Sequence, residues 1–213
     1  MDLSKAKVQR IEPLQEQEAR WVQLKKLVYL DPMGVERTWE FASRTTRVEG
    51  SDCDGVGIIA IIVKEEGPEI VVQKQYRAPV DKVCIELPAG LLDPNETILE
   101  CAQRELMEEC GLKGVPFAKD FYKGVPTTSV LMFNDPGFCN TNLKLVTLSV
   151  DPTDPINLNP KPQLEPNEFI ESFSIPLKDL PIKLREFFSE GYAIDARVQN
   201  ISMGILLSEA FLR

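Results

Sequence analysis

The sequence predicts an α/β fold in which helices cover both faces of a mixed β-sheet, as in an α/β/α sandwich. Three observations support it. Residues 57–63 (GIIAIIV) form a continuous apolar run rich in β-branched residues, which is typical of a strand buried on both faces. A capped amphipathic helix follows at about 97–111, and further strand and helix patterns continue to the C-terminus. We expect a small antiparallel β extension at residues 1–52 and the main domain at residues 53–213.

The N-terminal extension has the pattern of a β-hairpin. Apolar residues alternate with polar ones from Arg20 to Leu30, and a second extended run covers Val35 to Thr46. Between them lies Asp31-Pro32-Met33-Gly34, which predicts a turn. Because this extension has too few residues for a core of its own, we expect it to pack on the main domain or on a second subunit.

In the main domain the apolar strand at 57–63 is followed by a turn at 65–68 and a returning strand at 70–76. Further strands are expected at 84–87, near 128–133, at 143–150 and at 169–175, and closing helices at about 180–190 and 196–212. Residues 151–167 contain five prolines. Such a segment is too long for a plain connection, and both a functional lid and a disordered loop remain open for it.

The central helix carries an unusual set of carboxylates. Thr97 followed by Glu100 forms a capping box, and Gly111 marks the C-terminus. On a helical wheel Glu109 falls within the apolar side and Glu105 at its edge, with Glu108 beside them. Carboxylates gathered at a buried edge raise one another's pKa unless a cation lies among them. They therefore suggest Mg²⁺ or Mn²⁺, although an acidic helix edge paired with Arg104 is the simpler alternative.

Charge and composition exclude several kinds of function. The formal net charge is −9, which argues against binding to nucleic acid, where phosphates must be neutralised. The chain has no histidine, which excludes Ser-His-Asp triads, Cys-His pairs and imidazole metal sites. A general base must therefore be a carboxylate, Lys, Tyr, Cys or a metal-bound water.

The five cysteines are scattered and show no C-x-x-C spacing, so we expect neither a zinc site nor a disulfide framework. Reduced thiols favour a cytoplasmic or nuclear location. The N-terminus lacks the apolar core of a signal peptide, no run approaches transmembrane length, and no membrane partner is expected.

Residues 90–112 (GLLDPNETILECAQRELMEECGL) resemble the Nudix box, G-x5-E-x7-R-E-U-x-E-E-x-G-U with U apolar. The match covers every fixed position: Gly90, Glu96, Arg104, Glu105, Leu106, Glu108, Glu109, Gly111 and Leu112. This resemblance implies the Nudix-type sandwich fold and a metal-dependent hydrolase of nucleoside diphosphates linked to another moiety.

Beyond the box, the chain resembles the ADP-ribose and ADP-sugar pyrophosphatase branch of the Nudix family over roughly residues 20–210. The matching segments are TWE at 38–40, RTTR at 44–47, QYR at 75–77, ELPAG at 86–90, DPG at 135–137 and DAR at 195–197. Each segment is short, so the resemblance depends on the set.

The resemblance implies roles for individual residues. Glu105, Glu108 and Glu109, with the main-chain carbonyl of Ala89, would hold the metal ions, and Arg104 would fix the glutamates. Glu168, in a late loop, would lie near the attacking water, and either it or a glutamate of the box would accept the proton. Glu165 and Glu171 are close to Glu168 in the sequence.

For the substrate, the resemblance implies that Trp21 and Trp39 sandwich the adenine, with one of them open to come from a second subunit. Arg44 and Arg77 would bind the pyrophosphate, and Asp135 would lie near the terminal ribose. Core packing of the tryptophans and ordinary salt bridges of the arginines are the alternatives.

The expected function is Mg²⁺-dependent hydrolysis of the pyrophosphate of ADP-ribose, or of a related ADP-sugar, to AMP and a sugar phosphate, with Mn²⁺ as an alternative ion. Two other readings stay open: a Nudix pyrophosphatase acting on NADH, dinucleotides or oxidised nucleotides, and a non-catalytic ADP-ribose sensor. Because the β extension has an apolar surface but no core, we expect a homodimer.

Overall fold

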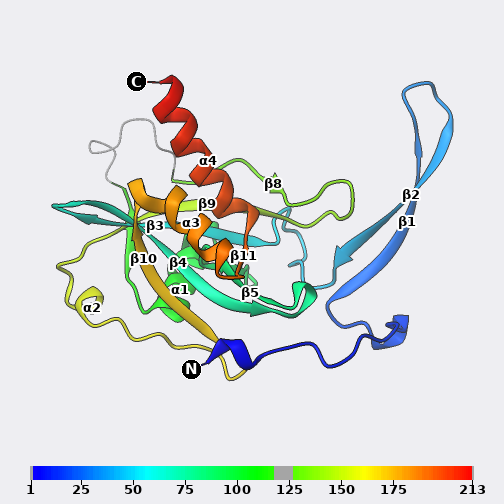
Figure 1. The fold of residues 1–213 in the computed structure, drawn as a ribbon. Coiled ribbons are helices and arrows are strands. Elements are labelled where there is room, and N and C mark those ends of the chain that lie inside the picture. Colours follow the sequence, from blue (N-terminus) through cyan, green and yellow to red (C-terminus); the bar gives the residue numbers. More distant parts are fainter. Residues whose placement is uncertain (1, 118–126, 213) are drawn as a thin grey trace.

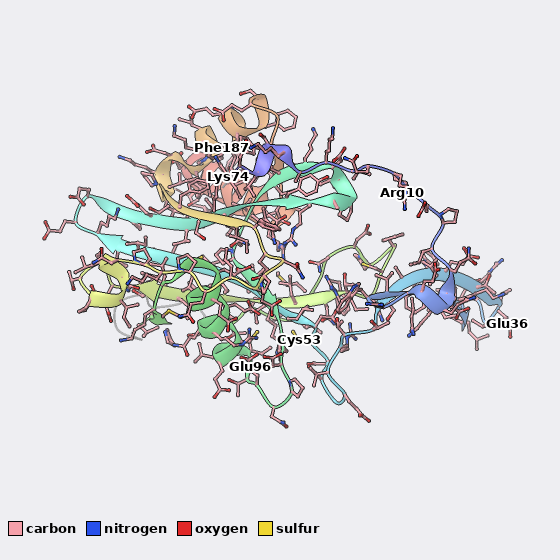
Figure 2. The ribbon with its side chains drawn as sticks, turned by 90° about the horizontal axis from the view of Figure 1, so that it is seen from below. Arg10, Glu36, Cys53, Lys74, Glu96 and Phe187 are labelled. Atoms are coloured by element: carbon pink, nitrogen blue, oxygen red, sulfur yellow. The ribbon has the colours of Figure 1, made fainter. Side chains whose placement is uncertain are left out.

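The computed structural model describes residues 2–117 and 127–212. It has three layers, with a mixed sheet between helix α1 (Ile98–Cys110) on one face and helices α3 (Leu180–Ser189) and α4 (Ala196–Phe211) on the other (Figures 1 and 2). This confirms the predicted α/β sandwich and both predicted C-terminal helices. A two-stranded ribbon projects from the body of the domain (Figure 1). No helix in the described part of the chain is long and apolar enough to span a membrane.

The sheet has the strand order β11-β5-β4-β3-β9-β7, in which β3 and β9 are parallel and β3 and β4 antiparallel. Strand β10 pairs with the other edge of β4, β6 pairs with β3, and β8 pairs with β9. The strand bounds are β3 Gly55–Lys64, β4 Gly67–Arg77, β5 Lys82–Glu86, β6 Ala89–Leu91, β7 Gly114–Pro116, β8 Met132–Phe133, β9 Asn142–Val150, β10 Ile170–Pro176 and β11 Ala193–Ile194. The short 3₁₀ turns are Leu3–Lys5, Glu16–Glu18, Ala78–Val80 and Leu177–Asp179.

Two apolar cores lie on the two faces of the sheet. The first joins β3, β4 and β9 to α1 and includes Ile58, Val71 and Leu106; the second joins the sheet to α3 and α4 and includes Ile70 and Leu184. Strand β3 supplies both cores, which confirms that the run at 57–63 is buried on both faces. Near 128–133 the expected strand shortens to Met132–Phe133, with an isolated bridge from Thr128 to Val146.

The ribbon consists of β1 (Val22–Leu30) and β2 (Glu36–Arg44), as the hairpin pattern predicts. Every residue of β1 is exposed. Below the ribbon, Arg47 donates from Nε and Nη2 to the buried carboxylate of Asp54 (2.8 and 3.0 Å). Burial works to raise the pKa of Asp54, but the Arg47 guanidinium and the Asn142 N–H together hold it below its usual value. This ion pair anchors the ribbon to the start of β3.

The proline-rich segment is ordered and lies along the end of α1. It contains one short helix, α2 (Pro155–Leu158), and Gln163 N–H donates to the carbonyl oxygen of Glu108 (2.7 Å). Gly111, the C-cap of α1, has φ of 67°, and its α-carbon faces the backbone of Lys161 and Pro162. A side chain at position 111 would therefore overlap the segment as well as strain the cap.

We expect Gly111→Ala to lower the free energy of unfolding by about 1–3 kcal/mol, because a Cβ would meet both a positive φ and the Lys161 backbone. Gly204→Ala is the matched control: Gly204 lies within α4 with nothing within 4 Å of a Cβ, so alanine should stabilise the helix by up to about 1 kcal/mol. Urea unfolding of both variants measures the difference. Equal midpoints would contradict both the left-handed cap and its packing against the segment.

Candidate active site

Helix α1 directs Glu109 into the interior of the domain, where the residue is only 4% exposed. Its carboxylate is held by two donors: the Ala89 N–H binds Oε2 (3.0 Å) and the Gln73 side chain binds Oε1 (3.4 Å). Ser172 Oγ also donates to the Glu109 main-chain oxygen (3.1 Å). The helical wheel predicted this burial. The wheel could not predict which groups donate hydrogen bonds to the carboxylate, because they lie on the sheet.

The carboxylates at this edge lack a sufficient cation. Burial raises the pKa of Glu109 to about 8, and the negative charges of Glu105 and Glu168 add to the effect. Burial also raises the pKa of Glu105, although the Arg104 guanidinium opposes the shift. A site whose acids resist ionisation in this way is stabilised by a bound positive charge. These residues therefore fit a divalent metal ion.

Arg104 lies among the glutamates but is already shared. Its Nε donates to Glu96 (2.7 Å), and its Nη1 donates to Glu105 (2.8 Å) and Glu108 (3.1 Å). These contacts raise the pKa of Arg104 above its ordinary value, led by the bond to Glu96, so the guanidinium stays charged. The acidic helix edge is therefore paired with Arg104, as the simpler alternative predicted. One guanidinium nevertheless cannot neutralise Glu96, Glu105, Glu108 and Glu109 together.

The main chain before α1 approaches Glu105 closely. At Gly90, in β6, a Cβ would overlap the carboxyl group of Glu105. A glycine here therefore lets the Ala89-Gly90 backbone lie beside the acids, where the carbonyl oxygen of Ala89 could serve as a ligand.

Within residues 2–117 and 127–212, no three acidic or thiol side chains converge into a ready-made metal cage. This is compatible with Mg²⁺, which usually takes one or two carboxylates and fills its other positions with water and substrate phosphate. Glu105 and Glu109 are the side chains best placed to serve. Glu108 is more exposed and contacts Arg104.

Glu168 lies near the same acids although it is far away in the sequence. It directly precedes Phe169 and strand β10, and its charge raises the pKa of both Glu105 and Glu109. Glu165 N–H donates to its Oε2 (3.1 Å), which shapes the turn that carries it. The other nearby carboxylate, Glu171, lines a cavity on the opposite face of the sheet.

The residues expected to bind substrate lie on separate elements of the fold. Arg77 forms a bidentate ion pair with the buried Glu86, whose Oε2 lies 2.6 Å from Nη2. Arg44 is exposed at the end of β2. Asp135 is exposed and accepts the N–H groups of Phe138 and Cys139 at its main-chain oxygen, closing a turn.

The two tryptophans lie on the ribbon, at separate places. Trp21 and Trp39 are 68% and 48% exposed, so neither is a core residue, contrary to the packing alternative. Trp39 pairs with Leu27 and donates from Nε1 to the Gly137 oxygen (3.2 Å), which brings the Asp135 turn beside it. Trp21 lies next to Thr45, just beyond the end of β2 and six residues after Trp39, which in extended chain places the two backbones about 20 Å apart. One chain therefore does not bring the two rings together.

Sequence reasoning missed a row of polar side chains beneath α1. Glu86, Gln73 and Ser172 are neighbours across β5, β4 and β10 and point to the same face. A glutamine directly after Val71 and Val72, in the middle of a buried strand, is the signal that could have revealed this row.

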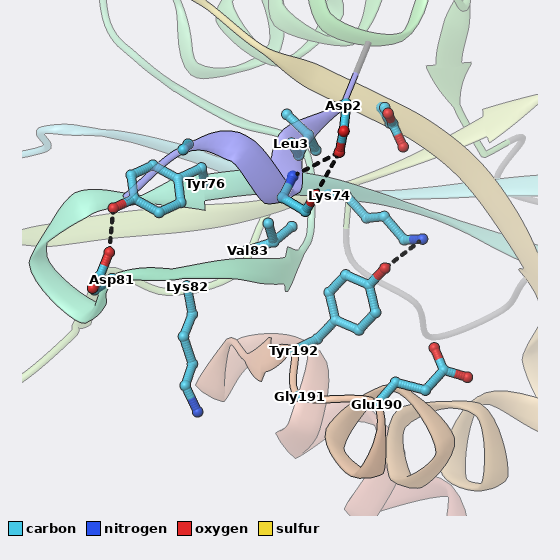
Figure 3. Close-up of a pocket in the computed structure, with 13 residues that line it drawn as sticks. Asp2, Leu3, Lys74, Tyr76, Asp81, Lys82, Val83, Glu190, Gly191 and Tyr192 are labelled. Carbon is cyan, nitrogen blue, oxygen red and sulfur yellow. Dashed lines mark hydrogen bonds between the residues drawn. The ribbon is translucent and has the colours of Figure 1, made fainter. Parts of the chain in front are cut away.

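A cavity of about 490 Å³ lies elsewhere, on the opposite face of the sheet (Figure 3). Leu3, Tyr76, Lys82 and Tyr192 are among its lining residues, and it includes none of the box glutamates. Its Lys74 ammonium group lies 4.8 Å from the centroid of the Tyr192 ring and is bonded to its hydroxyl oxygen (3.3 Å). This cavity is therefore separate from the box glutamates.

In the metal-free protein, the free energy of unfolding should fall as the pH rises from about 4.5 to about 8. Folded Glu109 keeps its proton up to a pKa of about 8, whereas the unfolded carboxyl loses it near 4.5. The folded state then binds more protons than the unfolded state, so a rising pH favours unfolding. Urea unfolding in EDTA across this range should show a shallower decline for Glu109→Gln. Parallel curves for both proteins would contradict the assignment.

Comparison with known proteins agrees with the geometry. The NUDIX domain model matches residues 54–194. The chain is 47% identical over 196 residues to the ADP-ribose pyrophosphatase of Saccharomyces cerevisiae, covering 91% of this chain and 80% of that protein. It is 34% identical over 190 residues to the ADP-sugar pyrophosphatase of Mus musculus, covering 88% and 83%.

A solved structure shares the fold. The crystal structure of an ADP compounds hydrolase superposes with a TM-score of 0.59 at 16% identity, covering 97% of this chain and 90% of that one. This structure supports the fold alone, whereas the family model and the two relatives also identify the family. The chain belongs to the Nudix hydrolase family and is most similar, among the relatives described here, to ADP-ribose and ADP-sugar pyrophosphatases.

Proposed function

We propose that the protein hydrolyses the pyrophosphate of ADP-ribose, or of a related ADP-sugar, to AMP and a sugar phosphate. The observation that carries this proposal is the buried, cation-deficient pair Glu105 and Glu109 beside the Ala89-Gly90 backbone. A pure binding module has no need for such a pair. The names of the yeast and mouse relatives support this class of substrate.

Nudix hydrolases generally need a divalent metal ion, and we propose Mg²⁺, with Mn²⁺ as a substitute. Glu105, Glu109 and the carbonyl oxygen of Ala89 would hold it, with Glu108 as a more exposed contributor. When bound, such ions neutralise phosphate charge and lower the pKa of water.

In the reaction, a water attacks one phosphorus of the pyrophosphate and the bond from that phosphorus to the bridging oxygen breaks. Glu168 accepts the proton of the water, since it is the carboxylate that a separate loop brings to the box glutamates. Arg104 keeps Glu105 and Glu108 in place. Glu86 fixes Arg77 through Nε and Nη2, so we assign Nη1 of Arg77, together with Arg44, to the pyrophosphate.

We also propose that residues 1–52 act as a dimerisation and base-stacking extension and that the protein is a homodimer. Leu24, Val28 and Leu30 leave the ribbon with a large exposed apolar surface. Trp21 and Trp39 are about 20 Å apart in one chain, so an adenine sandwiched between them draws one ring from each subunit. Asp135, on the turn bonded to Trp39, would lie near the terminal ribose.

The location we propose is the cytoplasm, with the nucleus as an alternative. The cysteines Cys53, Cys84, Cys101, Cys110 and Cys139 are all free, as expected in a reducing compartment. The net charge of −9 supports a small-molecule substrate rather than nucleic acid.

EDTA should abolish AMP release from ADP-ribose, and Mg²⁺ or Mn²⁺ should restore it. Glu109→Gln keeps the shape of the side chain but removes its charge, so kcat should fall at least about a hundredfold. Glu100→Gln is the matched control, because glutamine can keep the capping bond to Thr97 while the helix loses one exposed charge. Testing ADP-ribose, ADP-glucose and NADH side by side resolves the substrate. Full activity in EDTA would refute the proposal.

Subunit mixing tests the shared adenine site. Glu109→Gln is exchanged separately with Trp21→Ala and with Trp39→Ala, and AMP release is measured at ADP-ribose concentrations well below KM. If one tryptophan crosses the interface, its heterodimers contain one intact site, and about a quarter of wild-type activity should return. Recovery with one tryptophan variant and not the other identifies the residue that crosses. No recovery with either, after verified exchange, would mean that each site is built from one chain.

A further inference from the structure

The polar row beneath α1 contacts Glu109 at two levels. Ser172, in β10, binds its main-chain oxygen, and Gln73, in β4, binds its carboxylate. The two are direct neighbours across the sheet. Strand β4 lies between β10 and β5, so Gln73 stands in the middle of the row and is fully buried.

The carboxylate of Glu109 receives one donor on each oxygen. The Ala89 N–H binds Oε2 at 3.0 Å, and the Gln73 amide binds Oε1 at 3.4 Å, which is long for an N–H···O bond. Two donors from separate strands fix the rotation of the carboxylate plane, which a single donor cannot do. Because the Gln73 bond is long, its main effect is on orientation rather than on the stability of the metal-free fold.

The other end of the Gln73 amide is unsatisfied. Its Oε1 atom is buried and has no hydrogen-bond partner in the described structure. A buried carbonyl oxygen without a partner destabilises the fold, so an apolar side chain of the same size would pack at least as well here. Its neighbours Val71 and Val72 are of that kind. Packing therefore does not explain why this position carries an amide.

We propose that Gln73 is a positioning residue, which orients the Glu109 carboxylate for binding a divalent metal ion. This inference rests on the proposed function, and it concerns a residue outside the Nudix box. A ligand held in its binding orientation before the ion arrives loses less freedom on binding, and the groups that orient ligands commonly change metal affinity about 10–100-fold.

The test measures binding of Mn²⁺ alone, by the loss of the electron paramagnetic resonance signal of the free ion. Gln73→Met removes the amide at nearly constant volume, with Gln73→Leu as a second variant should the first fail to fold. We expect about tenfold weaker Mn²⁺ binding, a metal-free melting temperature that is unchanged or higher, and an unchanged KM for ADP-ribose at saturating metal.

Gln103→Met is the matched control. The Gln103 side chain is also partly buried, and its amide donates to the Gly114 oxygen at 2.8 Å, away from the acids. Its loss should lower the melting temperature and leave Mn²⁺ affinity intact. In a double-mutant cycle, adding Gln73→Met to Glu109→Gln should cause no further loss of affinity, since Gln73 acts through Glu109.

Equal Mn²⁺ affinity in the wild type and both Gln73 variants would overturn the inference and leave the proposed function standing. A lower melting temperature with unchanged binding would do the same, by making Gln73 a structural residue. A wild-type protein that binds no Mn²⁺ would overturn the proposed function itself, and this inference with it.

Discussion

The interaction on which the site depends is the burial of ionisable carboxylates between α1 and the sheet. In water, Glu105 and Glu109 would be ionised at neutral pH. In the interior the charged form is poorly solvated, and the pKa of Glu109 rises to about 8. Nearby features reduce this cost. Arg104 pairs with Glu105, the Ala89 N–H binds Glu109, and Gly90 has no side chain that would separate the backbone from the acids. They supply less positive charge than the acids require, and because of this deficit the edge fits a divalent metal ion.

The rest of the fold keeps these groups together. The capping box at Thr97 and the glycine cap at Gly111 fix the two ends of α1, and the Leu106 side of the helix packs on β3 and β9. The sheet then serves two functions at once. Its one face carries the polar row that contacts Glu109, and its other face carries the apolar core shared with α3 and α4.

Local pattern was sufficient for most of this structure. The run at 57–63 and the caps of α1 predicted β3 and the central helix because strand burial and helix capping are decided by neighbouring residues. The burial of Glu109 followed from helical periodicity. What could not be predicted depends on contacts between distant segments. Examples are the ion pair of Arg77 with the buried Glu86, the amide of Gln73 below Glu109, and the course of the proline-rich segment along α1. The hydrophobic periodicity of a sequence does not indicate which strand will lie under which helix.

The attachment of the proline-rich segment to the end of α1 has a dynamic consequence. Gln163 bonds to the Glu108 carbonyl, the Lys161-Pro162 backbone lies against Gly111, and the same segment runs on to Glu168. The last turn of the helix and this segment therefore share one local opening event rather than fraying separately. When that unit opens, the carboxylates on the helix and the one on the loop separate together.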